Sequence, residues 1–301
     1  MSDSDALATS RGTYHPLLGT NVEVRVVARG AGPGAALARA EAAERAAVAE
    51  VERLQDVFTV HDQDSELCRW RGGRLDTPSP ELVEVLAAAQ RWWRASGGGF
   101  HPAAGVLRQR WLRAEDEQRP PDAQELAELV AALAELPFRV EGAAVARTGD
   151  CAGVDLNAIA KGYIVDRGVA AAAASVGVVD VLVNAGGDLR HTGPEVVRVG
   201  VEDPDAVGGA PLAVLVLGEG AIATSGSVHR GFRIGGEWFG HVLDPRTGRP
   251  VQARPSTTVR APDAMTADAL ATVAGVLGWT EAAAVISGVP GAGARAVLPG
   301  G

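Results

Sequence analysis

The chain has 301 residues, which is long enough for one large domain or two small ones with an ample core. Its net charge of −9 argues against a general nucleic-acid binder, whose affinity would rest on Lys and Arg contacts to phosphate. No apolar run approaches the roughly 20 residues of a membrane span. The start is polar and shows no basic segment followed by an apolar one, so we expect no signal peptide and a cytoplasmic protein.

The cysteines and the start of the chain give no indication of a second domain. Cys68 and Cys151 are far apart and lack CxxC spacing, so neither a zinc site nor a disulfide framework is indicated. Residues 1–16 are small and polar, and we expect a disordered leader there. Because no internal repeat or clear linker follows, residues 17–301 are predicted to form a single domain.

The first third of the chain predicts one strand and three helices. Residues 18–30 alternate valine with polar neighbours, which is the period of a half-buried strand. Residues 35–58 have the apolar spacing of a long amphipathic helix. Asp64-Ser65-Glu66-Leu67 is a candidate cap that opens a short helix, and residues 79–95 predict a further helix with serine as its cap and proline just inside.

That last helix ends in three consecutive glycines, 97–99, followed by Phe100 and His101. One glycine usually suffices to end a helix, and the extra ones let the backbone approach another group closely. A flexible loop explains the same residues equally well. Farther on, residues 113–122 predict a charged surface connection and 125–136 a short helix.

The middle of the chain is predicted to fold as strand, helix, strand. Residues 138–148 form a strand pair, and a strand ends at residues 154–156. Asn157 is the expected N-cap of a helix over 158–175. Residues 178–183 then form a buried strand, which runs into a tight turn containing two glycines.

Short strands and two helices are predicted for the remainder. A hairpin is expected over residues 212–224, turning at Gly218-Glu219-Gly220, and a second hairpin turns at Gly235-Gly236. The last expected elements are a strand at 256–260, helices that begin at 262 and 280, and a strand at 294–298.

Lys161 is the only lysine in the chain, and every other basic residue is arginine. A guanidinium is a planar fork whereas an ammonium is a compact point charge, so one retained lysine indicates a site that a guanidinium would not fit. Chance survival on a surface helix is the alternative. Asp155 and Lys161 flank the predicted helix N-terminus, where free N–H groups favour phosphate. A structural ion pair between the two is the competing explanation.

Asp268 and Thr272 are four residues apart on a predicted helix that is otherwise small and apolar. Both side chains therefore point from one face, and a carboxylate with a hydroxyl suits Mg²⁺. A first-turn aspartate that complements the helix dipole is the simpler explanation of that residue alone. His241, in GHVLDPRTGRP, is suited to proton transfer near neutral pH, although a single strand histidine is more often just packed.

Common nucleotide and hydrolase motifs are missing from the sequence. Neither GxxxxGK[ST] nor GxGxxG occurs, which removes the usual phosphate-loop and Rossmann interpretations. Neither GxSxG nor HExxH is present.

Five motifs follow one another along the chain: DLNAIAKGYIVDR, LVNAGGDLR, ATSGS, HVLDPRTGRP and ADALAT. In this order and spacing they resemble the ApbE family of FAD:protein FMN transferases. LGTNVEVRV, FTVHDQDSEL and SGGGFHPAAGVL are similar to less specific blocks of the same family. The resemblance covers residues 18–289.

This resemblance implies an α+β, T-fold-like protein of mixed and antiparallel sheets packed with helices, with an FAD cleft between sheet and helices. It implies Mg²⁺-dependent cleavage of the FAD pyrophosphate, transfer of FMN to a threonine hydroxyl of an acceptor flavoprotein, and release of AMP. The metal ligands implied are the Ala158 carbonyl, Asp268 and Thr272. His241 would accept the threonine proton and Lys161 would assist. The FAD contacts implied are at Leu18, Gly99, Phe100, His101, Asp155, Lys161, His241 and Val242.

One position departs from the family pattern. The family commonly has aspartate where this chain has His101, so rate or specificity is expected to differ if that position orients flavin. His101 is also a candidate base in the aspartate's place. Two other functions stay open on the sequence: an FAD pyrophosphatase in which water replaces threonine, and a protein that only binds or stores FAD. Retention of Asp268, Thr272 and Lys161 argues against the second.

Overall fold

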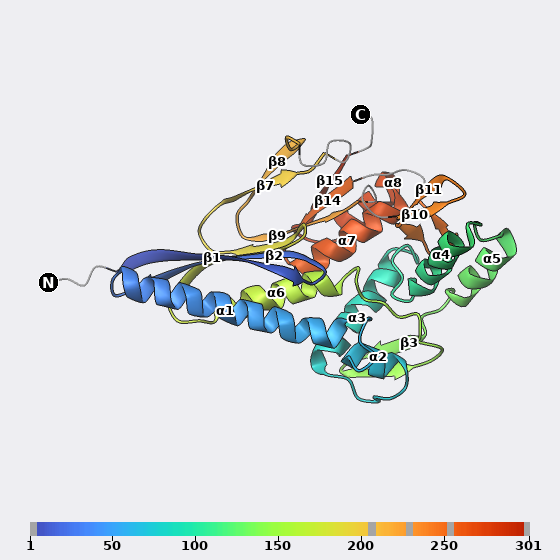
Figure 1. The fold of residues 1–301 in the computed structure, drawn as a ribbon, viewed down its shortest axis with the longest axis horizontal. Helices are drawn as coiled ribbons and strands as arrows, with labels where there is room; N and C mark the ends of the chain where they lie inside the picture. Colours follow the sequence, from blue (N-terminus) through green and yellow to red (C-terminus); the bar gives the residue numbers. More distant parts are fainter. Residues whose placement is uncertain (1–4, 204–208, 227–230, 252–255, 298–301) are drawn as a thin grey trace.

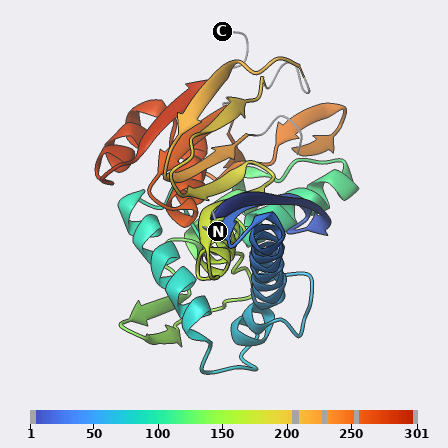
Figure 2. The same cartoon turned by 90° about the vertical axis from the view of Figure 1, so that its left-hand side faces the viewer.

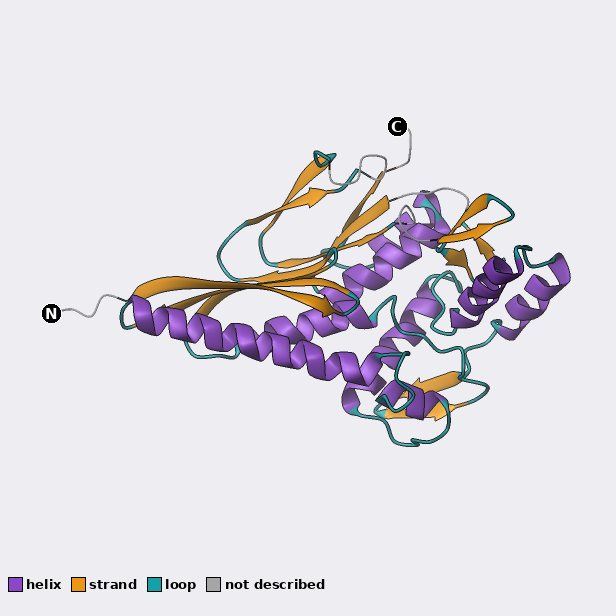
Figure 3. Ribbon diagram, in the orientation of Figure 1, coloured by secondary structure: helices purple, strands orange, loops and turns teal. Residues whose placement is uncertain are grey.

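A computed structural model describes residues 5–203, 209–226, 231–251 and 256–297. Its largest element is a seven-stranded sheet in which every neighbouring pair is antiparallel. Helices line one side of this sheet, so the fold is α+β, as expected (Figures 1 and 3). In spatial order the strands are β1 (Ala6–Leu17), β2 (Thr20–Gly30), β5 (Val178–Ala185), β6 (Asp188–Thr192), β9 (Gly220–Ser225), β14 (Ser256–Ala261) and β15 (Gly293–Val297).

Three helices pack on the sheet and build the main core: α1 (Pro33–Phe58), α6 (Ala160–Ala173) and α7 (Ala264–Leu277). Figure 2 looks almost along α1 and shows it beneath the β1–β2 hairpin. The small side chains of these helices let them approach closely. At Gly162 a Cβ would lie 2.2 Å from the Ala264 carbonyl oxygen, so glycine is required where the N-termini of α6 and α7 meet.

The remaining elements lie at the end of the sheet and along its margin (Figure 1). Trp111 connects a helix of this region to two hairpins. Its indole N–H donates to the Gly248 carbonyl at 2.8 Å, and its ring packs against Phe232 and Phe239. The helices are α2 (Glu66–Arg71), α3 (Pro80–Ala95), α4 (Gly105–Glu117), α5 (Ala123–Ala132) and α8 (Trp279–Ser287). The two-stranded hairpins pair β3 (Phe138–Glu141) with β4 (Ala144–Arg147), β7 (Val197–Val201) with β8 (Ala213–Leu217), β10 (Gly231–Ile234) with β11 (Glu237–Gly240) and β12 (Leu243–Asp244) with β13 (Arg249–Pro250).

The caps predicted at 64–67 and at Ser79 are confirmed, and in the first the capping residue is Ser65. Ser65 Oγ accepts a hydrogen bond from the Cys68 amide at 3.1 Å, and Ser79 Oγ accepts one from the Leu82 amide at 3.3 Å. Each satisfies an amide that the first turn of its helix leaves without a partner. Both cysteines are free and buried. No helix in the described part of the chain has the length and apolar content to cross a bilayer.

The expected disordered leader is wrong from Ala6 onwards. Residues from Ala6 to Leu17 form the edge strand β1, which pairs with β2 along its length. Ser10 and Tyr14 on this strand donate hydrogen bonds to the Glu44 carboxylate of α1. The sequence looked disordered because an edge strand of polar residues has no apolar periodicity, and its backbone partner lies on another segment.

Two local assignments were also wrong. The charged connection expected at 113–122 is helical over its first half, because residues 113–117 end α4 with their charged side chains exposed or half-buried. The hairpin over 212–224 does not form, because β8 pairs with β7 whereas β9 pairs with β6 and β14. A turn such as Gly218-Glu219-Gly220 shows that the chain bends, but long-range pairing decides which strands become neighbours.

Candidate functional site at the N-termini of helices α6 and α7

The start of α6 differs from the predicted one. Residues 154–156 form no strand, and Ile159 rather than Asn157 is the N-cap residue. The Asp155 carboxylate instead accepts a hydrogen bond from the Asn157 amide at 2.9 Å, which closes a local turn. The helix begins at Ala160, so Lys161 lies in its first turn and not its second.

Asp268 joins the two helices. Its carboxylate is buried and accepts a hydrogen bond from the Gly162 amide at 3.1 Å. That amide would ordinarily donate to the carbonyl four residues earlier, at Ala158. Within the described residues no backbone hydrogen bond to the Ala158 carbonyl is found. The Gly162 amide therefore donates to the Asp268 carboxylate and leaves the Ala158 carbonyl without its usual helical donor.

Lys161 is paired with Asp188, the first residue of β6. Nζ and Oδ2 are 2.5 Å apart, and the exposed fraction is 31% for the lysine side chain and 2% for the aspartate. Gly186 and Gly187, with φ of 62° and 105°, make the turn that places Asp188 here. The structural ion pair considered between Asp155 and Lys161 was therefore wrong, because the salt bridge of Lys161 is to Asp188.

The carboxylates around this junction are costly to ionise. Burial raises the pKa of Asp268 well above its usual range; the Asp188 charge raises it further and Lys161 opposes both. Burial also raises the pKa of Asp188, against the effect of Lys161. Asp166 accepts from the Ala264 and Met265 amides at 2.8 and 2.9 Å, and burial raises its pKa to about 6. A bound cation would stabilise such buried charges.

The segment after β11 packs on α7 one turn after Thr272. Thr272 is half-buried, one turn after Asp268. Val242 Cγ1 is 4.0 Å from where a Cβ of Gly275 would lie, and Gly275 is one turn after Thr272. His241, also half-buried, immediately precedes Val242. The tertiary structure therefore brings the 241–242 segment against the helix that carries both proposed side-chain metal ligands.

The glycine-rich segment after α3 packs on the other end of α7. A Cβ at Gly99 would lie 2.3 Å from Leu277 Cδ2, and one at Gly98 would lie 4.0 Å from Arg246 Cγ. Phe100 is buried, and its amide donates to Ser96 Oγ at 2.8 Å. Close packing against Leu277 of α7 accounts for Gly99, whereas Gly97 and Gly98 have positive φ of 57° and 86°, the left-handed backbone that favours glycine.

His101 is buried beside Trp93, with the two rings edge to face at 6.4 Å between centroids. Its Nδ1 accepts a hydrogen bond from the Ala103 amide at 3.0 Å. Burial lowers the pKa of His101 to about 4. A neutral, buried ring whose acceptor nitrogen is already used is poorly arranged to act as a base.

The buried His101 makes stability depend on pH. Its folded pKa lies below the unfolded value of 6.5, so the unfolded state binds more protons between pH 6.5 and 4. Stability should fall as pH drops through that window. Urea unfolding at pH 7.5 and pH 5 should show about 2 kcal/mol more loss for the parent than for His101→Gln. His15→Gln, at an exposed position of β1, should behave like the parent. Equal losses in parent and His101→Gln would contradict this assignment.

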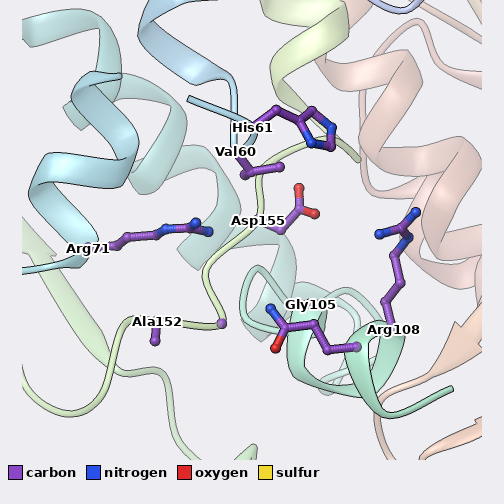
Figure 4. Close-up of a pocket in the computed structure, with 9 residues that line it drawn as sticks. Val60, His61, Arg71, Gly105, Arg108, Ala152 and Asp155 are labelled. Carbon is purple, nitrogen blue, oxygen red and sulfur yellow. The ribbon is translucent and has the colours of Figure 1, made fainter. Parts of the chain in front are cut away.

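Asp155 lines a small cavity of about 170 Å³ (Figure 4). Its carboxylate points toward His61, Arg71 reaches in from one side, and Arg108 stands on the other. Sequence reasoning did not single out these three residues. They come from segments far apart in the chain, and no local spacing distinguishes them from ordinary surface residues.

Leu18 lies in the turn between β1 and β2 with a φ of 54°, a conformation unusual for a residue with a side chain. Its amide donates to Gln55 Oε1 at 2.7 Å. This holds the turn beside the last part of α1, the helix that leads into the Val60–His61 wall of the cavity. The hydrogen bond explains how the strained backbone is maintained.

Fold and site together define a class of protein. A large antiparallel sheet supports two helix N-termini, where a lysine, buried carboxylates and an available carbonyl meet in a form suited to a cation and phosphate. The chain belongs to the ApbE family, whose sequence pattern matches residues 18–295. The resemblance noted in the sequence is therefore confirmed.

Similar proteins support this assignment. The FAD:protein FMN transferase of Treponema pallidum is 29% identical, with 94% of this chain and 83% of that protein covered. The FAD:protein FMN transferase of Haemophilus influenzae is 31% identical, with 76% and 71% covered. The structure of the ApbE protein from Thermotoga maritima superposes with a TM-score of 0.80 at 28% identity, covering 98% of this chain and 96% of that one.

Proposed function

We propose that this chain transfers FMN from FAD to a threonine hydroxyl of an acceptor flavoprotein and releases AMP. The observation that carries the proposal is the junction of α6 and α7, where Lys161, Asp188 and Asp268 lie around a helix N-terminus. The names of its curated relatives support the same activity. A helix N-terminus with an adjacent ammonium is suited to a pyrophosphate.

Mg²⁺ fits the donor set at this junction. The Ala158 carbonyl, Asp268 and Thr272 would hold it, because all three offer hard oxygen ligands and the Gly162 amide leaves the Ala158 carbonyl available. When bound, the ion would supply charge neutralisation for the pyrophosphate oxygens. The raised pKa of Asp268 supports a cation here, since burial alone disfavours the carboxylate.

The reaction is a displacement at the FMN-side phosphorus. The threonine oxygen forms a bond to that phosphorus, and the bond from it to the bridging oxygen breaks. AMP leaves with the bridging oxygen, while the threonine proton passes to His241. Lys161 offsets the negative charge of the pyrophosphate. Catalysis would come mainly from positioning and charge neutralisation.

FAD would lie in a cleft between the sheet and the helices. Asp155 lines the cavity of Figure 4, Lys161 lies in the first turn of α6 and the 241–242 segment packs on α7, which supports the contacts proposed there. The contact proposed at Leu18 is supported by the hydrogen bond of its amide to Gln55, which fixes the turn beside α1. The contacts proposed at Gly99, Phe100 and His101 would have to come chiefly from backbone, because the Phe100 and His101 side chains are buried.

The test is incubation of the protein with FAD, Mg²⁺ and a flavin-acceptor domain. We expect the acceptor to gain the mass of FMN less water, with one AMP released per acceptor modified. AMP and free FMN formed without acceptor would identify a pyrophosphatase instead. Bound FAD with no AMP under any condition would identify a protein that only binds FAD, and would refute the transferase.

A further inference from the structure

Asp188 is a buried carboxylate whose place is set by the backbone. It follows the Gly186-Gly187 turn, at the first position of β6, and is 1% exposed. Its carboxylate oxygen is 2.5 Å from the ammonium of Lys161. Strand β6 pairs with β5, and α6 packs on both strands. The position of the Asp188 carboxylate is therefore fixed by the sheet and does not change when the lysine side chain moves.

Lys161 differs from its partner in being partly exposed. A lysine side chain has four rotatable bonds between its backbone and its charge, and a surface ammonium samples many positions. Here the buried Asp188 carboxylate holds the ammonium, while 31% of the lysine side chain is open to solvent. The charge is thereby held by a fixed carboxylate, at a lysine whose side chain remains partly open to solvent.

We propose that Asp188 is a positioning residue that holds Lys161 for the pyrophosphate of FAD. The inference rests on the proposed function and gives Asp188 a role that the sequence motifs do not assign to it. Asp188 acts through Lys161 and does not itself touch the substrate. Its effect should fall on the rate of transfer more than on FAD binding, because a correctly oriented charge matters most as the phosphorus–oxygen bond breaks.

A purely structural carboxylate in this sheet has different surroundings. Asp180 on β5 is equally buried, but it contacts His191 at 2.9 Å, Arg25 at 3.0 Å and the Glu195 amide at 3.1 Å. Its partners lie on strands and a turn, away from the start of α6. Asp180→Asn is therefore the matched control, since it makes the same chemical change in the same sheet.

A double-mutant cycle tests the coupling. Asp188→Asn should lower kcat for FMN transfer by at least about tenfold while KM for FAD changes less than threefold. In a Lys161→Met background the same substitution should change kcat less than twofold. Asp180→Asn should lower the melting temperature and leave kcat within twofold of the parent. Equal losses from Asp188→Asn in both backgrounds would overturn the proposal.

The single lysine allows a second measurement without turnover. NMR of protein labelled with ¹³C,¹⁵N-lysine gives a single set of side-chain signals, that of Lys161. We expect it to differ from that of a flexible lysine, to shift when FAD is added, and to move to flexible-lysine values in Asp188→Asn. An unchanged signal in Asp188→Asn would overturn the positioning role. A parent that transfers no FMN would instead refute the proposed function, and the lysine signal would still report whether Asp188 holds Lys161.

Discussion

Asp268→Ala is expected to abolish AMP release, because it removes the only carboxylate among the three proposed metal ligands. Loss of groups that merely orient metal ligands costs about 10–100-fold, so losing the ligand itself should exceed a hundredfold. Asp268→Asn separates this effect from packing, since the amide oxygen can still accept the hydrogen bond from the Gly162 amide. It should be as inactive as Asp268→Ala.

Thermal stability gives an independent measure of the same site. Mg²⁺ should raise the melting temperature of the parent and leave that of Asp268→Asn unchanged, because a ligand stabilises only the state that binds it. Without metal, Asp268→Asn should be at least as stable as the parent, since burial disfavours the charged carboxylate.

Asp263→Asn is the matched control on the same helix. Asp263 caps α7 by accepting from the Thr266 amide at 2.7 Å, and asparagine caps helices equally well. Its turnover should match the parent. A normal rate of AMP release in Asp268→Asn at the same Mg²⁺ concentration would contradict the metal assignment.

Lys161→Arg should lower kcat by about tenfold or more, equivalent to about 1.4 kcal/mol, even though it keeps the positive charge. The reason is geometric. The ammonium is 2.5 Å from a carboxylate that is almost fully buried, and a planar guanidinium needs more room and a different approach. Lys161→Met, which removes the charge, should be less active still.

The reverse exchange on the same helix is the control. Arg167 on α6 is 46% exposed and lies 3.6 Å from Glu50, an arrangement in which the choice of cation matters little. Arg167→Lys should therefore keep kcat within twofold of the parent. Near-normal activity in Lys161→Arg would return the single lysine to a coincidence of composition.

Local chemistry made several elements predictable. The alternating valines of β2 and the apolar spacing of α1 indicate which face of each element is buried. The capping serines at 65 and 79 mark the residues where two helices begin. The i, i+4 spacing of Asp268 and Thr272 is enough to place both on one face of α7. Each of these signals lies within one turn of helix or a few residues of strand.

Burial and long-range pairing were not predictable in the same way. β1 is a strand because β2 lies beside it, and His101 is neutral because Trp93 and its surroundings exclude water. Neither the pairing of β1 nor the burial of His101 can be predicted from the residues next to it in the sequence. The cavity around Asp155 was missed for the same reason, since its lining comes from four separate segments.

Lys161 illustrates the difference between what the local sequence predicts and what the tertiary structure decides. By itself the sequence determined that one lysine stands among arginines near the start of a helix, which was enough to suggest an anion site. Only the tertiary structure decided that its partner is Asp188, 27 positions later, and that Asp268 accepts from the α6 backbone. Side-chain type and spacing act locally, whereas ion pairing and desolvation depend on which distant segments the packed core brings together.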